Sequence, residues 1–157
     1  WFNGRRTPWA DPELKGALIG LTLGTDAPRL FRALVETTAF GSKATAEEFN
    51  RQGLDVREVI AQGGIPEKNP FVMQVTADVL NMPIKTVRSN QAVALGAAMF
   101  ASVASGVYSN IKEAQAAMGS GYQRVYKPDL SNAAYYQVLY TKYLETGEKL
   151  SSMLRDL

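Results

Sequence analysis

Two glycines and an Asn-Pro pair form the part of this sequence best suited to holding a ligand. Gly63-Gly64 follows the apolar run Val59-Ile60-Ala61, and Asn69-Pro70 opens a helical pattern shortly afterwards. Glycines at the carboxyl end of a strand let the backbone approach a ligand, because no Cβ stands in the way. The helix start beyond them presents unsatisfied N–H groups and the positive end of the helix dipole. Nucleotides and phosphates bind in such crevices, but a strand-to-helix loop also needs glycine to turn and Asn-Pro to begin a helix.

The residue types exclude several kinds of chemistry. The 157 residues contain neither histidine nor cysteine. The chain therefore has no disulfide, no thiolate nucleophile, no usual zinc site and no Ser-His-Asp relay. Acid–base work would fall to Asp, Glu, Lys or Tyr, yet no pair of carboxylates stands out, and Asp26 is explained as a helix N-cap. Neither a P-loop nor a Rossmann fingerprint is present, so any bound nucleotide uses another architecture.

Charge and hydropathy point away from nucleic acid and membrane. Seventeen basic and fifteen acidic side chains leave a net charge of only +2. The uncharged run over residues 89–111 is rich in Ala, Gly and Ser and carries amides, so we interpret it as a buried helix rather than a membrane span. We expect no targeting segment, since residues 1–6 lack a charged region followed by an apolar stretch, and the absence of cysteine fits the cytoplasm.

Two further patterns have both a functional and a structural explanation. Arg5-Arg6 lies in an aromatic loop and could face a ligand or a partner domain, but a solvated or loop-holding pair explains it as well. The cluster Tyr135, Tyr136, Tyr140 and Tyr143 could stack on bases. Its helical spacing instead favours a packed helix face.

Strands and helices alternate along the chain. Trp1, Phe2 and Trp9 supply apolar anchors to an opening loop over residues 1–15. The expected strands cover residues 16–22, 56–61, 84–87 and 124–126. Helices are expected after N-caps at Asp26, Asn69, Asn110 and Ser131, and a small-residue helix over 91–105 should pack closely on a sheet. This alternation predicts an α/β fold with a short sheet layered with helices, and so few strands suggest that others precede them.

Three groups of residues resemble the FGGY family of carbohydrate kinases. Residues 16–36 resemble the second sequence signature of that family, with departures at Arg29 and Leu34. Residues 63–83 resemble its adenine-side loop and helix, and residues 94–98 resemble the small-residue helix that follows. The matching residues are Gly16 to Leu21, Leu30, Ala33, Val35, Glu36, Gly63, Gly64, Asn69, Pro70, Phe71, Gln74, Ala77, Asp78, Pro83 and Ala94 to Ala98. Longer stretches at 3–8, 21–28 and 71–83 are similar to members that act on L-ribulose.

The resemblance implies a fold, and it implies that ATP and the sugar bind to different parts of the protein. The chain would be the later portion of a ribonuclease-H-like domain of the actin and hexokinase type, within the C-terminal kinase domain. It would comprise the opening loop 1–15, a nucleotide-side core 16–108 and C-terminal helices 109–157. ATP would rest on this side of a cleft and the sugar on an N-terminal domain. The general-base Asp and a first phosphate-contacting turn would precede Trp1, so no catalytic residue is expected within the chain.

The same resemblance nominates residues for nucleotide binding. Gly63 and Gly64 would line the pocket, and Asn69 would lie near the adenine or ribose. Lys68 is a weaker candidate because loop lengths vary at this point, and Gln62 would flank the pocket. No metal ligand is expected here, since Mg²⁺ would be held by the phosphates and by the missing half.

The implied reaction transfers the γ-phosphate of ATP to a primary hydroxyl of L-ribulose, giving ADP and L-ribulose 5-phosphate in L-arabinose catabolism. The chain would be inactive without the upstream half. Two alternatives stay open: another kinase of the family acting on xylulose, glycerol or a similar polyol, and a non-catalytic module that keeps the fold without nucleotide. A homo-oligomer is also open, and no nucleic-acid or membrane partner is expected.

Overall fold

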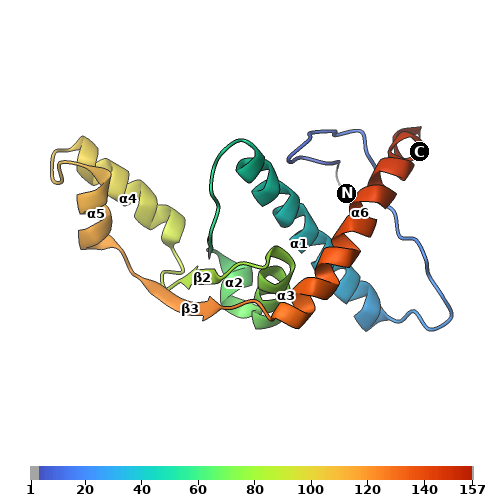
Figure 1. Ribbon diagram of the computed structural model, residues 1–157. Coiled ribbons are helices and arrows are strands. Elements are labelled where there is room, and N and C mark those ends of the chain that lie inside the picture. The colour runs from blue at the N-terminus through green and yellow to red at the C-terminus, as the bar shows by residue number, and fades with distance from the viewer. Residues whose placement is uncertain (1–3, 157) are drawn as a thin grey trace.

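The computed structural model describes residues 4–156, in which helices dominate over a small sheet (Figure 1). Trp1 and Phe2, the expected anchors, lie outside the described residues. The elements in chain order are α1 (Ala27–Arg51), β1 (Val59–Ala61), α2 (Gly64–Lys68), α3 (Pro70–Leu80), β2 (Ile84–Val87), α4 (Ala92–Ala104), α5 (Ile111–Met118), β3 (Tyr122–Tyr126) and α6 (Leu130–Asp156).

The sheet has β2 at its centre and is mixed, which confirms the predicted fold class. β1 runs parallel to β2 with Val59 opposite Ile84, and β3 runs antiparallel to β2 with Tyr126 opposite Ile84. Helix α3 covers one face of the sheet, where Met73 and Ala77 pack with Ile84 and Tyr126. This βαβ arrangement brings the carboxyl ends of β1 and β2 to the same edge of the sheet.

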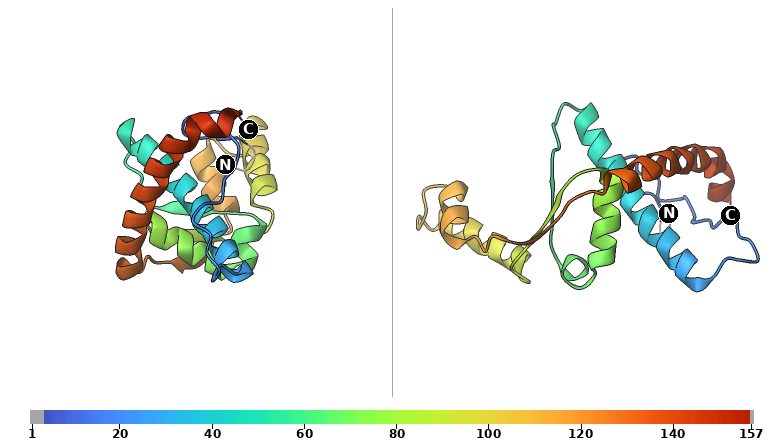
Figure 2. Two further views of the ribbon diagram at one scale, coloured as in Figure 1. Left: turned by 90° about the vertical axis from the view of Figure 1, so that its right-hand side faces the viewer. Right: turned by 60° about the horizontal axis from the view of Figure 1, so that its bottom comes forward.

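A second core lies where α1, α3 and α6 pack together (Figure 2). Phe40 of α1 contacts two buried tyrosines of α6, with ring centroids 6.4 Å from Tyr136 and 5.8 Å from Tyr140. Val79 of α3 completes this cluster and is fully buried. Tyr136 and Tyr140 therefore lie on a packed helix face, as the spacing predicted, whereas Tyr135 is exposed.

Helix starts follow the expected caps with one exception. The Asp26 carboxylate accepts a hydrogen bond from the Arg29 amide at 3.0 Å, and Asn69 and Asn110 cap α3 and α5 in the same way. The prediction that Ser131 caps α6 is wrong. Asp129 accepts from the Ser131 and Asn132 amides at 2.9 and 3.1 Å, because α6 begins at Leu130 and the acceptor must precede it.

The expected strand at residues 16–22 is absent, and this prediction is wrong. The segment has no regular structure, and its residues are exposed, including Leu18, Ile19 and Leu21. A strand exists only where its N–H and C=O groups pair with a neighbour. Among residues 4–156 no strand lies beside this segment. Its residues are of the types found in strands, but they have no neighbouring strand with which to pair.

The small-residue helix forms but does not pack on the sheet. α4 packs against α5, and the two helices lie away from the α1, α3 and α6 core (Figure 2). Met99 is the one residue of α4 that is buried within the described part of the chain, while Val93 and Phe100 are exposed. The helix that the sequence predicted to be buried is therefore only partly covered by the other described elements. No described helix combines the length and apolarity that crossing a membrane requires.

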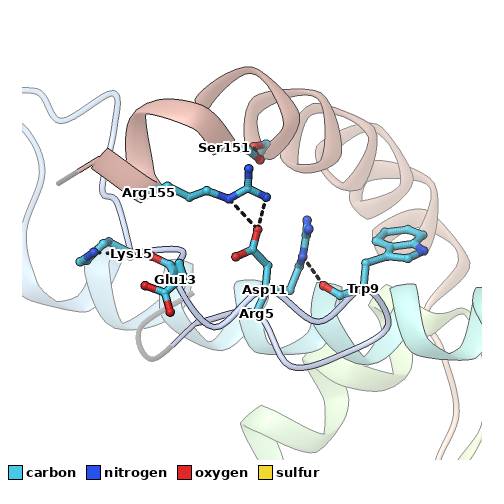
Figure 3. Close-up of polar contacts among 8 residues, drawn as sticks. Arg5, Trp9, Asp11, Glu13, Lys15, Ser151 and Arg155 are labelled. Carbon is cyan, nitrogen blue, oxygen red and sulfur yellow. Dashed lines mark hydrogen bonds and ion pairs between the residues drawn. The ribbon is translucent and has the colours of Figure 1, made fainter.

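The opening loop is fastened to the last helix (Figure 3). Arg5 and Asp11 exchange backbone hydrogen bonds, and the buried Asp11 carboxylate pairs with the Arg155 guanidinium of α6. The Arg5 side chain donates to the Trp9 carbonyl at 2.6 Å, so it holds the loop in place. Gly4 is required at the base of this loop. It has φ +73°, and a Cβ there would lie 2.6 Å from Pro12 Cα.

Candidate functional site

A small polar cavity lies at the carboxyl ends of the two parallel strands. Its volume is about 210 Å³, and it lies between the turn after β1 and the turn after β2. Both turns meet there because β1 and β2 run parallel, with Ala61 opposite Thr86 at their ends. The cavity is lined by Ala61, Gln62, Gly63, Pro66, Glu67, Thr86, Val87, Arg88, Ser89, Asn90 and Gln123.

Gly63 makes the turn after β1 possible. Its φ is +98°, in the region that disfavours side chains, and a Cβ built on it would meet no atom within 4 Å. The glycine is therefore required by the backbone conformation and leaves open space above it. The next residues form the short helix α2, in place of the loop that the sequence predicted.

Hydrogen bonds to β3 and to the residue before it hold the end of β2 and the turn that follows. The Arg88 amide donates to the Gly121 carbonyl at 3.1 Å, and the Thr86 hydroxyl donates to the Arg124 carbonyl at 3.4 Å. The pairing of β2 with β3 shifts register between Thr86 and Val87, which is typical of a bulge that redirects side chains. Ser89 closes the turn by accepting from the Gln91 amide at 3.1 Å.

Two charged side chains line this cavity and are not used elsewhere in the described structure. Glu67 comes from α2 and Arg88 from the turn after β2, and both are exposed. Among residues 4–156 neither side chain makes a hydrogen bond or an ion pair, whereas five other charge pairs are formed. The carboxamides of Gln62, Asn90 and Gln123 and the Ser89 hydroxyl add neutral donors and acceptors.

The structure brings some of the predicted site residues together and separates others. Gln62 and Gly63 line the cavity. Gly64 begins α2, Lys68 ends it, and neither lines the cavity. Asn69 does not line it either, and its carboxamide oxygen accepts the Val72 amide at 3.2 Å and caps α3.

The sequence analysis missed the contribution of the second and third strands. Arg88, Ser89 and Asn90 follow a parallel strand directly, which is a signal that could have nominated them. Gln123 has no such signal, since it reaches the site only through the antiparallel pairing of β3. Glu67 lay in the expected loop but was not selected.

A metal site is not formed by the described part of the chain. No group of three or more Asp or Glu residues within 4–156 could hold an ion.

A larger cavity, about 790 Å³, lies between the opening loop, α1 and α6, and it shares no residue with the cavity at the strand ends. Position at two parallel strand ends, rather than size, therefore selects the candidate site.

Comparison with known proteins gives one family. The sequence profile of the FGGY family of carbohydrate kinases, C-terminal domain, matches residues 1–105. The chain is 46% identical over 153 residues to the ribulokinase of Vibrio parahaemolyticus, covering 98% of this chain and 27% of that protein. It is 46% identical to the ribulokinase of Bacillus licheniformis over 149 residues, which are 92% of this chain and 27% of that protein.

Solved structures agree with the family. The chain is similar to the gluconate kinase of Lactobacillus acidophilus, with a TM-score of 0.85 and 29% identity over 98% of this chain and 30% of that chain. The ligand-bound xylulose kinase of the same organism gives a TM-score of 0.85 and 29% identity, covering 98% of this chain and 31% of that chain. The chain spans about a quarter of the length of the curated relatives.

Proposed function

Because the chain belongs to the FGGY family of carbohydrate kinases, we propose that it forms the ATP-binding portion of a kinase that phosphorylates L-ribulose. The observation that carries the proposal is the polar cavity at the carboxyl ends of β1 and β2, built on Gly63. Similarity to ribulokinases over nearly the whole chain supports L-ribulose as the acceptor. In this proposal the sugar and the general base lie on the part of the protein outside this chain.

The chain would contribute binding and orientation. Phosphoryl transfer depends mostly on positioning and charge neutralisation, so a rigid nucleotide-binding site contributes directly to catalysis. The open backbone at Gly63 would admit the nucleotide, while Gln62 would lie beside it. Gly64, Lys68 and Asn69 stay candidates at its margin. In this proposal the Mg²⁺ ion is held by the ATP phosphates and by the part of the protein outside this chain.

The test uses the full-length protein and a panel of acceptors. L-ribulose, D-xylulose, glycerol and gluconate are compared in an ATP-dependent phosphorylation assay that detects ADP. We expect the largest kcat/KM for L-ribulose, and ADP formation to require Mg²⁺. A larger kcat/KM for another acceptor would reassign the substrate within the family. Failure of the protein to bind ATP or ADP at millimolar concentration, measured by calorimetry, would instead favour a non-catalytic module.

A matched pair of glycine variants tests the location of the site. Gly63 and Gly53 both have positive φ, +98° and +90°, and both have open space around a built Cβ. Substitution by Ala strains both backbones similarly, but only Gly63→Ala places a methyl group in the wall of the cavity. We expect Gly63→Ala to raise the KM for ATP about tenfold, equivalent to about 1.4 kcal/mol, with Gly53→Ala near wild type. Equal effects of the two substitutions would move the site elsewhere.

A further inference from the structure

The two charged residues of the cavity come from different turns of the chain. Glu67 follows β1 through α2, and Arg88 follows β2 directly. Neither side chain has a hydrogen bond or ion pair among the described residues, although both line one cavity. The Arg88 backbone is held by the Gly121 carbonyl at 3.1 Å, so its side chain starts from a fixed position.

The size and lining of the cavity select one end of the nucleotide. About 210 Å³ is below the roughly 300–1,000 Å³ of pockets that enclose a whole drug-sized ligand, so only part of ATP fits. The phosphate end carries several negative charges, and the cavity offers it no net positive charge, because one carboxylate, Glu67, and one guanidinium, Arg88, line it together. Neutral carboxamides at Gln62, Asn90 and Gln123 match the hydrogen-bonding edges of a base and the hydroxyls of a ribose.

Resting on the proposed ATP-binding function, we infer that Arg88 and Glu67 recognise the nucleoside end of ATP. The planar guanidinium of Arg88 stacks on the adenine face, an interaction that arginine makes with aromatic rings. The Glu67 carboxylate accepts hydrogen bonds from the ribose hydroxyls, as acidic residues do in other nucleotide sites. Both residues therefore set nucleotide affinity and selectivity and take no part in the transfer step.

Arg88→Ala separates base contact from phosphate contact. Calorimetry on the full-length protein measures the affinity for adenosine, AMP, ADP and ATP. Loss of stacking should weaken all four by a similar factor, about fivefold. In steady-state assays the KM for ATP should rise, with kcat and the KM for L-ribulose unchanged. Arg57→Ala is the control, because Arg57 pairs with Asp55 on the surface outside the cavity.

Glu67→Met tests the ribose contact, because it removes both carboxylate oxygens and keeps a side chain of similar length. Wild-type protein should bind ATP more tightly than 2′-deoxy-ATP, and the substitution should remove most of that difference. The inference is overturned if Arg88→Ala weakens ATP but leaves adenosine binding intact, which would indicate a phosphate contact. It is also overturned if Glu67→Met keeps the full preference for ATP over 2′-deoxy-ATP. Absence of all nucleotide binding in the wild-type protein would contradict the proposed function itself. That result is distinct from the two outcomes for the Arg88 and Glu67 variants.

Discussion

At the scale of single residues, the buried polar groups of this chain hold helices together. Asp78 is almost fully buried and accepts three hydrogen bonds, from the Gln74 side chain at 2.8 Å, the Asp129 amide at 2.9 Å and the Asn132 side chain at 3.0 Å. Two of these donors belong to the start of α6, so Asp78 joins α3 to α6. A buried carboxylate is tolerated because its oxygens are satisfied in this way.

Asp78→Ala should therefore be strongly destabilising. The substitution removes the acceptor of the Asp129 amide and of the Asn132 side chain, while Gln74 keeps its bond to the Lys127 carbonyl, and we expect the free energy of unfolding of this region to fall by about 3 kcal/mol. Hydrogen exchange in α3 and the first turns of α6 of the full-length protein measures the change. Asp55→Ala, which removes a carboxylate paired with Arg57 on the surface, should change stability by no more than about 0.5 kcal/mol.

Lys43 is a buried cation with neutral partners. Its Nζ donates to the Val79 carbonyl at 3.0 Å and to the Gln137 side chain at 2.7 Å. Burial lowers the pKa of Lys43 below its ordinary value of 10.5, because the charged form loses water, while Glu47 opposes the shift. The folded state therefore binds this proton less tightly than the unfolded state.

This pKa direction predicts how stability varies with pH. Between the lowered pKa and 10.5 the unfolded state carries more protons, so wild-type stability rises with pH across that interval. Lys43→Met removes the titrating group at similar volume and should lack this rise. Comparing the Tm of the two proteins from neutral pH to about pH 10 checks the expectation. A constant difference in Tm across this range would contradict it.

At the scale of elements, local signals near helix ends were reliable. Asp26, Asn69 and Asn110 cap the helices that the sequence assigned to them, because an N-cap bonds an amide only two or three residues away. The strand at 16–22 and the packing of α4 were not reliable, since each depends on a distant surface. Asn69 has two roles to separate: it is the N-cap of α3, and it is a candidate contact for the nucleotide.

Two substitutions separate these roles of Asn69. Asn69→Ala removes the cap and should cost about 1 kcal/mol, whereas Asp keeps an acceptor for the Val72 amide and should preserve stability. If the Asn69 carboxamide also donates to the nucleotide, both variants should raise the KM for ATP. Thermal unfolding and the ATP dependence of the kinase rate measure the two effects. An Asn69→Asp protein with wild-type KM would limit Asn69 to capping.

At the scale of the whole molecule, the beginning and end of the chain are joined. Arg155 near the end of α6 pairs with Asp11 (Figure 3). The Lys15 amide donates to the Leu154 carbonyl at 3.1 Å. The hydrogen bond from Arg155 holds the pKa of Asp11 below its ordinary value of 3.8. Stability contributed by this pair is fully present above 3.8 and is lost as the pH falls through the lowered pKa.

Asp11→Asn should therefore loosen the loop only where Asp11 is charged. At neutral pH we expect faster hydrogen exchange in the last turn of α6 than in wild type, because the ion pair with Arg155 is gone. The difference should shrink as the pH falls below 3.8. Exchange measured by mass spectrometry over a series of pH values provides the test, and an equally large difference at the lowest pH would rule out the charge as the cause.

The sequence by itself determined the starts of α1, α3 and α5 and the Gly63 turn, because each is specified by neighbours within a few residues. Its resemblance to a kinase family nominated Gly63 as lining a nucleotide pocket and Gln62 as flanking it, and both residues line the cavity at the strand ends. Only the tertiary structure decided that Arg88 and Gln123 line the same cavity, since parallel and antiparallel pairing bring them there. It likewise decided that residues 16–22 stay unpaired and that α4 packs on α5, because strand pairing and helix packing depend on partners far away in the chain.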